Sequence, residues 1–148
     1  MISKYNEDMK TDKTIYLIGR IHEQANKFLL NELEQIGFRD ISPSHGDILV
    51  TLFQYKECTM TDLSNSIHRD RSTVTALVNK LIKLGYITSR KADEDNRSTI
   101  IALTQKGMAL EAGFQAISDK LFDVEYQGIS AEEKEVFQRV LQKVLDNF

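Results

Sequence analysis

The sequence predicts a mainly α-helical fold that carries a small β wing. Apolar residues recur with helical periodicity along most of the chain. Only the segment 86–103 differs, because it reads as two short strands around a charged tip at 91–98. With 148 residues the chain has the length of one compact subunit. We therefore expect a single unit over 1–148 without a second domain.

The first half of the chain contains three predicted helices. The first covers about 11–37, where apolar residues keep a helical period. Ser42 and Pro43 begin a second helix that continues to Tyr55, with serine as the N-cap and proline at the first helical position. A third, short helix is predicted at Thr59–Ile67, with Thr59 and Asp62 forming its N-terminal cap.

The fourth predicted helix, Asp70–Leu84, has Asp70 as N-cap and Gly85 as its C-terminal stop. Its apolar stripe consists of Val74, Leu77, Val78 and Leu81. No acidic residue occurs from Arg71 to Leu84, and the opposite face carries short hydroxyl side chains and cations. Short side chains let a backbone approach base edges and cations suit phosphates. The alternative is an ordinary solvated face, which would usually carry Glu/Lys pairs.

Two strands, Tyr86–Arg90 and Thr99–Leu103, complete this segment. Two helices, the second with a basic face, followed by a hairpin with an arginine form a winged helix-turn-helix, here at about 42–104. Such a unit can enter both grooves of duplex DNA.

The C-terminal segment 104–148 is expected to be helical. Thr104 begins a long helix that ends near Gly128, and Ser130 with Glu133 forms a capping box for the last helix. These helices and the first one carry more apolar surface than a lone winged unit can bury. We therefore expect them to be dimerisation helices of a homodimer. The alternative is that they close over the core of one monomer.

The segment 70–87 resembles the recognition helix and first wing strand of the MarR family of bacterial transcription regulators. The pattern Arg90-x-x-Asp93-x-Asp95-x-Arg97, followed by Leu103-Thr104-x-x-Gly107, resembles the wing signature of that family. The resemblance extends over nearly the whole chain. One position departs from it, because Ala76 stands where the family often has a basic residue. We therefore expect Asn79 or Lys80 to carry more of the readout.

The combined pattern predicts a homodimeric transcription regulator, a repressor, that binds a pseudo-palindromic operator in double-stranded DNA. The residues expected at the DNA are Arg71, Ser72, Thr73, Thr75, Ala76, Asn79, Lys80, Lys83, Arg90, Asp95 and Arg97. Lys83 and Arg90 would contact phosphates, and Arg97, oriented by Asp95, would reach the minor groove. The alternatives are a protein-interaction module and a ligand-binding module without DNA readout.

The charge distribution agrees with this prediction. The chain has a net charge of −3, yet residues 60–107 contain eight Lys/Arg against five Asp/Glu. The cations are thus concentrated in one segment of an otherwise acidic chain, as expected for a local phosphate-binding surface.

The resemblance also implies a small lipophilic or phenolic effector that lowers DNA affinity. Tyr16, His22, His45 and Tyr55 are expected to line a cleft between the first two helices and the winged unit. Taken singly, each is as readily explained as a residue at the edge of the core.

Other classes of function are not expected. The chain lacks a glycine-rich phosphate loop, and its three histidines are far apart in sequence, so we predict no enzyme activity, metal or cofactor. No apolar run approaches the roughly 18 residues of a membrane span, and the N-terminus is polar. The one cysteine, Cys58, is expected to be structural, and the protein cytoplasmic.

Overall fold

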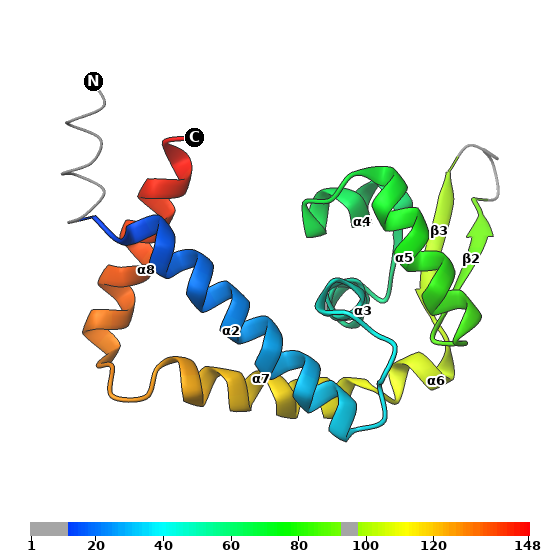
Figure 1. Cartoon of the computed structure of the whole chain (residues 1–148). Helices are drawn as coiled ribbons and strands as arrows, with labels where there is room; N and C mark the ends of the chain where they lie inside the picture. Colours follow the sequence, from blue (N-terminus) through cyan, green and yellow to red (C-terminus); the bar gives the residue numbers. More distant parts are fainter. Residues whose placement is uncertain (1–11, 93–97) are drawn as a thin grey trace.

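The computed structural model of the chain describes residues 12–92 and 98–148. It is mainly helical with one small antiparallel sheet, which confirms the predicted fold class. The elements in chain order are α2 (Thr14–Gln35), α3 (Pro43–Tyr55), β1 (Glu57–Thr59), α4 (Met60–Ile67), α5 (Arg71–Lys83), β2 (Ile87–Lys91), β3 (Thr99–Leu103), α6 (Gln105–Met108), α7 (Glu111–Glu125) and α8 (Ala131–Asp146). We call α3 to β3 the winged lobe, and α2, α7 and α8 the arm. Figure 1 shows the winged lobe at one end of the molecule and α8 at the other.

The sheet has three strands in the order β1-β3-β2, whereas the sequence pattern predicted only the β2–β3 hairpin. The additional strand, β1, pairs with β3 so that Cys58 lies opposite Ile101. With only three residues, β1 has no alternating pattern of its own. It is defined by its pairing with β3, which joins the α3–α4 connection to the wing.

The predicted helix N-caps are confirmed at three positions. The Asp70 carboxylate accepts a hydrogen bond from the Thr73 amide at 2.9 Å, and the Thr59 hydroxyl accepts one from the Asp62 amide at 3.1 Å. Ser130 and Glu133 form the expected reciprocal capping box at the start of α8. These side chains satisfy amides that have no partner within the helix, which fixes where each helix begins.

The long helix predicted from Thr104 to near Gly128 is instead divided into α6 and α7. The Thr104 hydroxyl caps α6 by accepting from the Gly107 amide at 3.1 Å. The Leu110 amide then donates to the Gly107 carbonyl at 3.1 Å, three residues back, which tightens the chain into a turn before α7 begins. A Cβ at position 107 would overlap the carbonyl oxygen of Tyr86, so glycine allows α6 to pack directly on the start of the wing.

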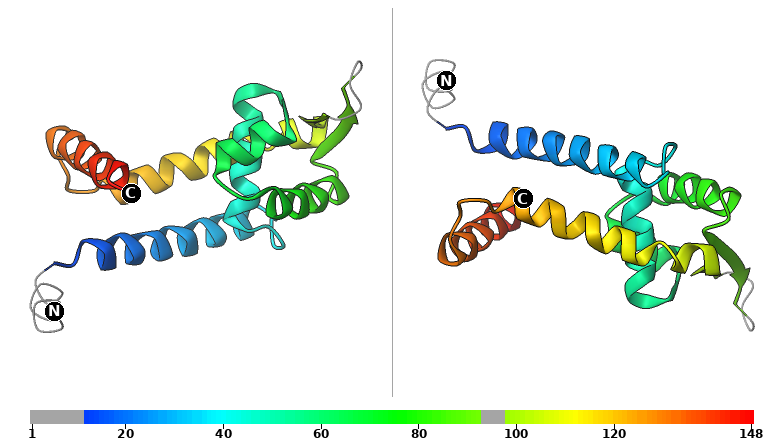
Figure 2. Two further views of the ribbon diagram at one scale, coloured as in Figure 1. Left: turned by 90° about the horizontal axis from the view of Figure 1, so that it is seen from above. Right: turned by 90° about the horizontal axis from the view of Figure 1, so that it is seen from below.

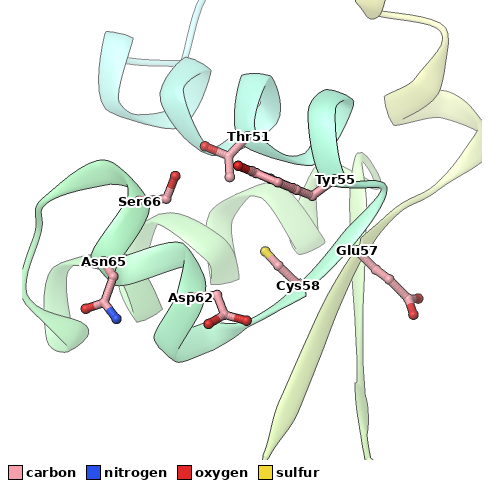
Figure 3. Close-up of a pocket in the computed structure, with 7 residues that line it drawn as sticks. All are labelled: Thr51, Tyr55, Glu57, Cys58, Asp62, Asn65 and Ser66. Atoms are coloured by element: carbon pink, nitrogen blue, oxygen red, sulfur yellow. The ribbon is translucent and has the colours of Figure 1, made fainter.

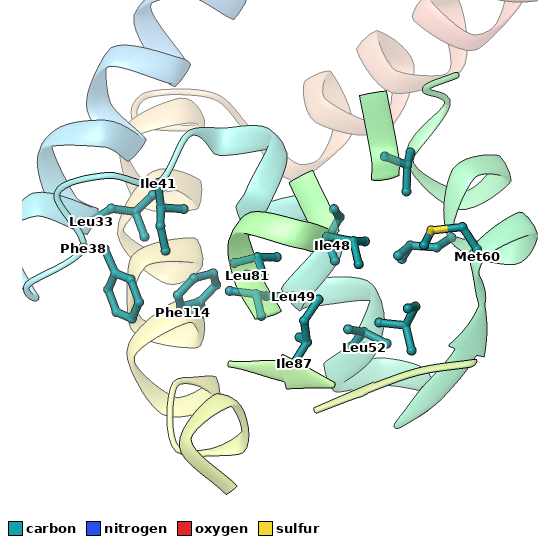
Figure 4. Packing of buried hydrophobic residues seen from close by; sticks show 14 of the residues in the cluster. Leu33, Phe38, Ile41, Ile48, Leu49, Leu52, Met60, Leu81, Ile87 and Phe114 are labelled. Carbon is teal, nitrogen blue, oxygen red and sulfur yellow. The ribbon is translucent and has the colours of Figure 1, made fainter. Parts of the chain in front are cut away.

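The hydrophobic core lies in the winged lobe (Figure 4). Its fully buried side chains are Ile48, Leu49, Leu52, Leu63, Val74, Val78, Leu81, Ile87 and Ile101. Phe114 of α7 extends the core toward the arm and packs edge-to-face on Phe38 and Phe53, with ring centroids 5.9 and 5.6 Å apart. The base of the arm is therefore anchored in the same core as the winged lobe.

The rest of the arm buries little within one chain. Leu33 is the one buried residue of α2, and α8 has none. Figure 2 shows α2 and α7 extending together away from the winged lobe, with α8 turning off at the far end. Although α2 has 22 residues, no helix among the described residues is long and apolar enough to cross a membrane.

Candidate nucleic-acid interface

The outer face of α5 is solvent-exposed, as its apolar stripe requires. Val74, Val78 and Leu81 are buried in the core, and Leu77 is half-buried at the edge of the stripe. The exposed positions on α5 include Ser72, Thr75, Ala76, Asn79 and Lys83, while Thr73 and Lys80 are half-buried beside them. The predicted helix residues thus form one continuous surface.

The N-terminus of α5 is organised by Asp70. Its carboxylate accepts hydrogen bonds from the Ser72 hydroxyl at 2.6 Å, and from the Thr73 amide and hydroxyl at 2.9 Å each. These bonds, with the Ser72 hydroxyl contributing most, lower the pKa of Asp70 to about 2. The cap is therefore ionised at every pH at which the protein is expected to work.

The hydroxyl groups on this face donate their protons inside the protein. Ser72 and Thr73 donate to Asp70, and the Thr75 hydroxyl donates to the Arg71 carbonyl at 2.8 Å. Toward a partner in this state they offer acceptor lone pairs and, for threonine, a methyl group. Those groups match the amino groups of adenine and cytosine and the methyl group of thymine in the major groove.

Asn79 differs from these hydroxyl residues. Its exposed side chain makes no hydrogen bond to any other described residue, so the amide can both donate and accept. Such an amide matches the adjacent donor and acceptor of adenine. Ala76, one turn earlier, leaves the approach to Asn79 open.

Two arginines, one in the turn before α5 and one at its first position, contact neighbouring helices. His68 adopts a left-handed conformation with φ of 54°, which ends α4. The Arg69 guanidinium donates to the Ser44 hydroxyl at 3.4 Å, and that of Arg71 donates to the Thr61 hydroxyl at 3.3 Å. The Arg71 side chain therefore links the first turn of α5 to the N-terminal turn of α4.

The C-terminus of α5 is fastened to α6. Lys106 donates from Nζ to the Leu84 carbonyl at 2.8 Å, and the same nitrogen lies 4.6 Å from the centroid of the Tyr86 ring. The Thr104 hydroxyl donates to the Gly85 carbonyl at 2.6 Å. Sequence reasoning missed Lys106, since its partner is 22 residues away and no local pattern marks the pairing.

The wing contains one pairing that the sequence did not predict. Arg90, assigned from sequence to a DNA phosphate, donates to both carboxylate oxygens of Glu57 at 3.0 and 3.2 Å. The hydrogen bonds and charge of Arg90 lower the pKa of Glu57. This pair connects β2 to β1 across the sheet. The other two predicted wing residues, Asp95 and Arg97, lie outside the described residues.

The four residues predicted to line an effector site lie on two helices, Tyr16 and His22 on α2 and His45 and Tyr55 on α3. Tyr16 is exposed on α2, and His22 lies 3.1 Å from Asn26 on the same helix. His45 is buried, and its Nδ1 accepts a hydrogen bond from the Ser42 amide at 3.0 Å, so the ring completes the N-terminal cap of α3. Burial, and secondly the charge of Lys80, lowers the pKa of His45.

Tyr55, the fourth of these residues, lines a pocket of about 520 Å³ between α3, β1 and α4. The described residues that line it are Thr51, Tyr55, Glu57, Cys58, Asp62, Asn65 and Ser66 (Figure 3). Burial, and secondly the charge of Asp62, raises the pKa of the Cys58 thiol, which keeps it protonated near neutral pH. Among the described residues, no group of three or more His, Cys, Asp or Glu side chains could hold a metal ion.

The fold and the exposed face of α5 define a winged helix-turn-helix protein. The MarR family model matches residues 41–99. The transcriptional regulator SarZ of Staphylococcus haemolyticus is 30% identical over 100 residues, covering 68% of this chain and 67% of SarZ. The chain belongs to the MarR family.

Two further proteins extend this similarity over nearly the whole chain. The transcriptional repressor IacR of Pseudomonas putida is 22% identical over 142 residues, covering 96% of this chain and 83% of IacR. The MepR–DNA complex of S. aureus contains a chain that superposes with a TM-score of 0.84 at 27% identity, covering 91% of this chain and 98% of MepR. The match therefore includes the arm as well as the winged lobe.

Proposed function

We propose that this protein is a transcription regulator that binds double-stranded DNA through the outer face of α5. The observation that carries the proposal is this exposed surface, which is free of acidic side chains from Arg71 to Lys83 and presents acceptors, an amide and cations. The MepR structure, which has the same fold, was solved bound to DNA. A helix of this kind enters the major groove while the wing contacts an adjacent groove.

The proposed roles follow from position along α5. Ser72, Thr73, Thr75 and Asn79 would face bases, with Ala76 allowing close approach. Arg71, Lys80 and Lys83 would contact bases or nearby phosphates, Lys83 being a phosphate contact because it comes late on the helix. In the wing, Arg97 would enter the minor groove and be oriented by Asp95, while Arg90 would contact the DNA backbone or hold the wing through Glu57.

The proposed active form is a homodimer assembled through the arm. Large apolar side chains remain exposed along the part of the arm that lies far from the core: Ile15, Leu17, Ile21, Phe122, Val124, Val136, Phe137, Val140 and Leu145. An apolar surface spread over three helices destabilises an isolated monomer in water. A twofold dimer would bury it and would place two copies of α5 in successive major grooves, about 34 Å apart.

This geometry supports a pseudo-palindromic operator and, in the simplest case, repression by occupying a promoter. IacR, which is similar over most of the chain, is a transcriptional repressor. The cellular site of action would be the cytoplasm, where bacterial DNA is located. We further propose a small lipophilic or phenolic effector, which would act by favouring one spacing of the two α5 helices over another.

The rival proposals are a protein-interaction module and a ligand-binding module without DNA readout, and DNA binding itself separates them. Operator fragments can be selected from genomic DNA with the purified protein and titrated by fluorescence anisotropy. DNA binding predicts that affinity falls steeply as salt rises. If no selected duplex shows salt-sensitive binding, the DNA-binding proposal is contradicted and the two rival proposals remain.

Two variants separate sequence readout from phosphate contact in the same assay. Asn79→Ala should reduce the ratio of operator to random-duplex affinity by about tenfold or more, because a base contact is lost. Lys83→Ala should weaken both duplexes similarly and reduce the salt slope by about one. A change of sequence preference with Lys83→Ala alone would contradict the proposed position of α5 in the groove.

A further inference from the structure

The pocket between α3, β1 and α4 is built from three elements that meet beside the sheet. Thr51 and Tyr55 come from α3, Cys58 from β1, and Asp62 from α4 (Figure 3). The sulfur of Cys58 points between the two helices, whereas the Glu57 side chain points away from them. The volume of about 520 Å³ falls within the range of small-molecule sites.

The charged side chains that line this pocket, Glu57 and Asp62, are both acidic. Among the described residues, the lining contains no Lys, Arg or His. Glu57 is occupied by Arg90, with both oxygens accepting hydrogen bonds. Among the described residues, the Asp62 carboxylate accepts no hydrogen bond and forms no ion pair. The pocket therefore repels an anion and offers Asp62 as an available counter-ion for a cation.

The remaining groups favour an organic cation. The Thr51 hydroxyl donates its proton to the Asp47 carbonyl at 2.9 Å, so it presents acceptor lone pairs to its surroundings. Tyr55 adds an aromatic ring whose face attracts cations. The described residues contain no cluster of three metal-ligating side chains, so these groups do not form a metal site.

We propose that this pocket binds a small organic ammonium ion, with Asp62 as counter-ion and Tyr55 as its aromatic wall. Binding itself does not depend on DNA. Its consequence rests on the proposed function, because the Thr61 hydroxyl beside Asp62 accepts the hydrogen bond of Arg71 at the start of α5. A ligand that fixes α4 against α3 would then act on the N-terminus of the DNA-binding helix.

The test uses the single cysteine of the chain as a reporter of occupancy. Alkylation of Cys58 by iodoacetamide is followed by intact-protein mass spectrometry with phenethylamine or 3-phenylpropionate present, a cation and an anion of similar size. We expect phenethylammonium to slow alkylation, with half-protection at about millimolar concentration. 3-Phenylpropionate should give no protection. Equal protection by both compounds, or none by phenethylamine, would overturn the proposal.

Two variants test which side chains bind the cation, and a third variant serves as a control. Asp62→Asn keeps the shape of the side chain but removes the charge, so the concentration for half-protection should rise about tenfold. Tyr55→Leu should also raise it, by less. Asp123→Asn removes the same charge from α7, far from the pocket lining, and should change nothing. Unaltered protection in Asp62→Asn would refute the assignment. Operator affinity is measured separately without ligand, so a failure of DNA binding is recognised on its own.

Discussion

The winged lobe and the arm differ in how much of their structure one chain can complete. The winged lobe has a closed core, with side chains such as Leu52 and Leu63 fully buried. In the arm, α8 has no buried residue, and Leu145 is 66% exposed. Both regions have regular, capped helices, so local structure does not explain the difference.

The difference shows that helix formation and helix burial are separate requirements. The capping box of Ser130 and Glu133 defines where α8 begins, yet Val136, Val140 and Leu145 of its apolar stripe stay exposed among the described residues. In the winged lobe the same kind of stripe on α5 is buried by α3, α4 and β2. In the proposed homodimer the stability of the arm would therefore depend on a second chain, whereas that of the winged lobe would not.

The largest expected effect tests this contrast with one substitution in two places. Leu52→Ala should lower the free energy of unfolding by about 2–5 kcal/mol, because it leaves a cavity in the core. Leu145→Ala should cost little in the monomer, and its effect should depend on protein concentration because the contacts that Leu145 would make in the proposed dimer are between chains. Urea unfolding at two protein concentrations, with sedimentation to follow dimerisation, measures both. A Leu145→Ala loss that is independent of concentration and unaccompanied by dissociation would show that the arm closes on its own chain.

The joint between the two regions should be sensitive at Gly107. Gly107→Ala places a Cβ against the Tyr86 carbonyl oxygen, which is backbone and cannot turn aside. We expect a loss of about 1–3 kcal/mol in unfolding free energy and weaker operator binding, because α6 also holds the C-terminus of α5.

The matched control for this substitution is Gly113→Ala on α7. There a Cβ would meet the Ile36 Cδ1 at 3.5 Å, an ordinary contact, inside a helix that alanine favours. Stability should rise by up to about 1 kcal/mol and DNA affinity should stay unchanged. If both glycine variants change stability and DNA affinity alike, the close approach of α6 to the wing does not contribute to either quantity.

A smaller, pH-dependent effect is expected from His45 in the winged lobe. Its pKa is lowered in the folded protein by burial and then by Lys80, so the unfolded chain binds the proton first as pH falls. The free energy of unfolding should therefore decrease below about pH 6.5, by at most about 1.4 kcal/mol per pH unit. The neutral ring is required because Nδ1 accepts from the Ser42 amide. His45→Gln can keep a capping box and should remove this part of the pH dependence, measured by thermal unfolding from pH 5 to 8. An unchanged pH profile would exclude His45 as its source.

Much of the fold could be predicted because its signals are local. The N-cap of Asp70 and the buried stripe of Val74, Val78 and Leu81 follow from spacing within one helix. The position of β1 could not be predicted, since three residues take extended structure only through pairing with β3. The break before α7 was also missed, because it depends on packing of α6 against Tyr86, a contact that Gly107 allows and that the sequence pattern does not indicate.

The candidate site divides in the same way. The exposed face of α5 follows from helical periodicity, whereas the roles of Lys106 and Glu57 depend on partners 22 and 33 residues away. The sequence also did not predict that the His45 ring accepts a hydrogen bond from the Ser42 amide and so caps its own helix. A single sequence shows which residue types lie on which face of a helix. The hydrogen-bond partner of a side chain that lies far away in sequence is defined only by the fold.

The smallest effect on stability, and the last test of the comparison, concerns Arg90 and Glu57. Both side chains are 51% exposed, so breaking the pair should change unfolding free energy by less than about 1 kcal/mol. If Arg90 acts by holding the wing, Glu57→Gln and Arg90→Met should each weaken operator binding by about two- to threefold. A direct phosphate contact gives a different pattern, in which Arg90→Met reduces the salt slope by about one and Glu57→Gln strengthens binding by removing a negative charge. Because the arginine is bidentate to the carboxylate, we expect the first pattern. Tighter binding of Glu57→Gln in anisotropy titrations at two salt concentrations would return Arg90 to the DNA backbone.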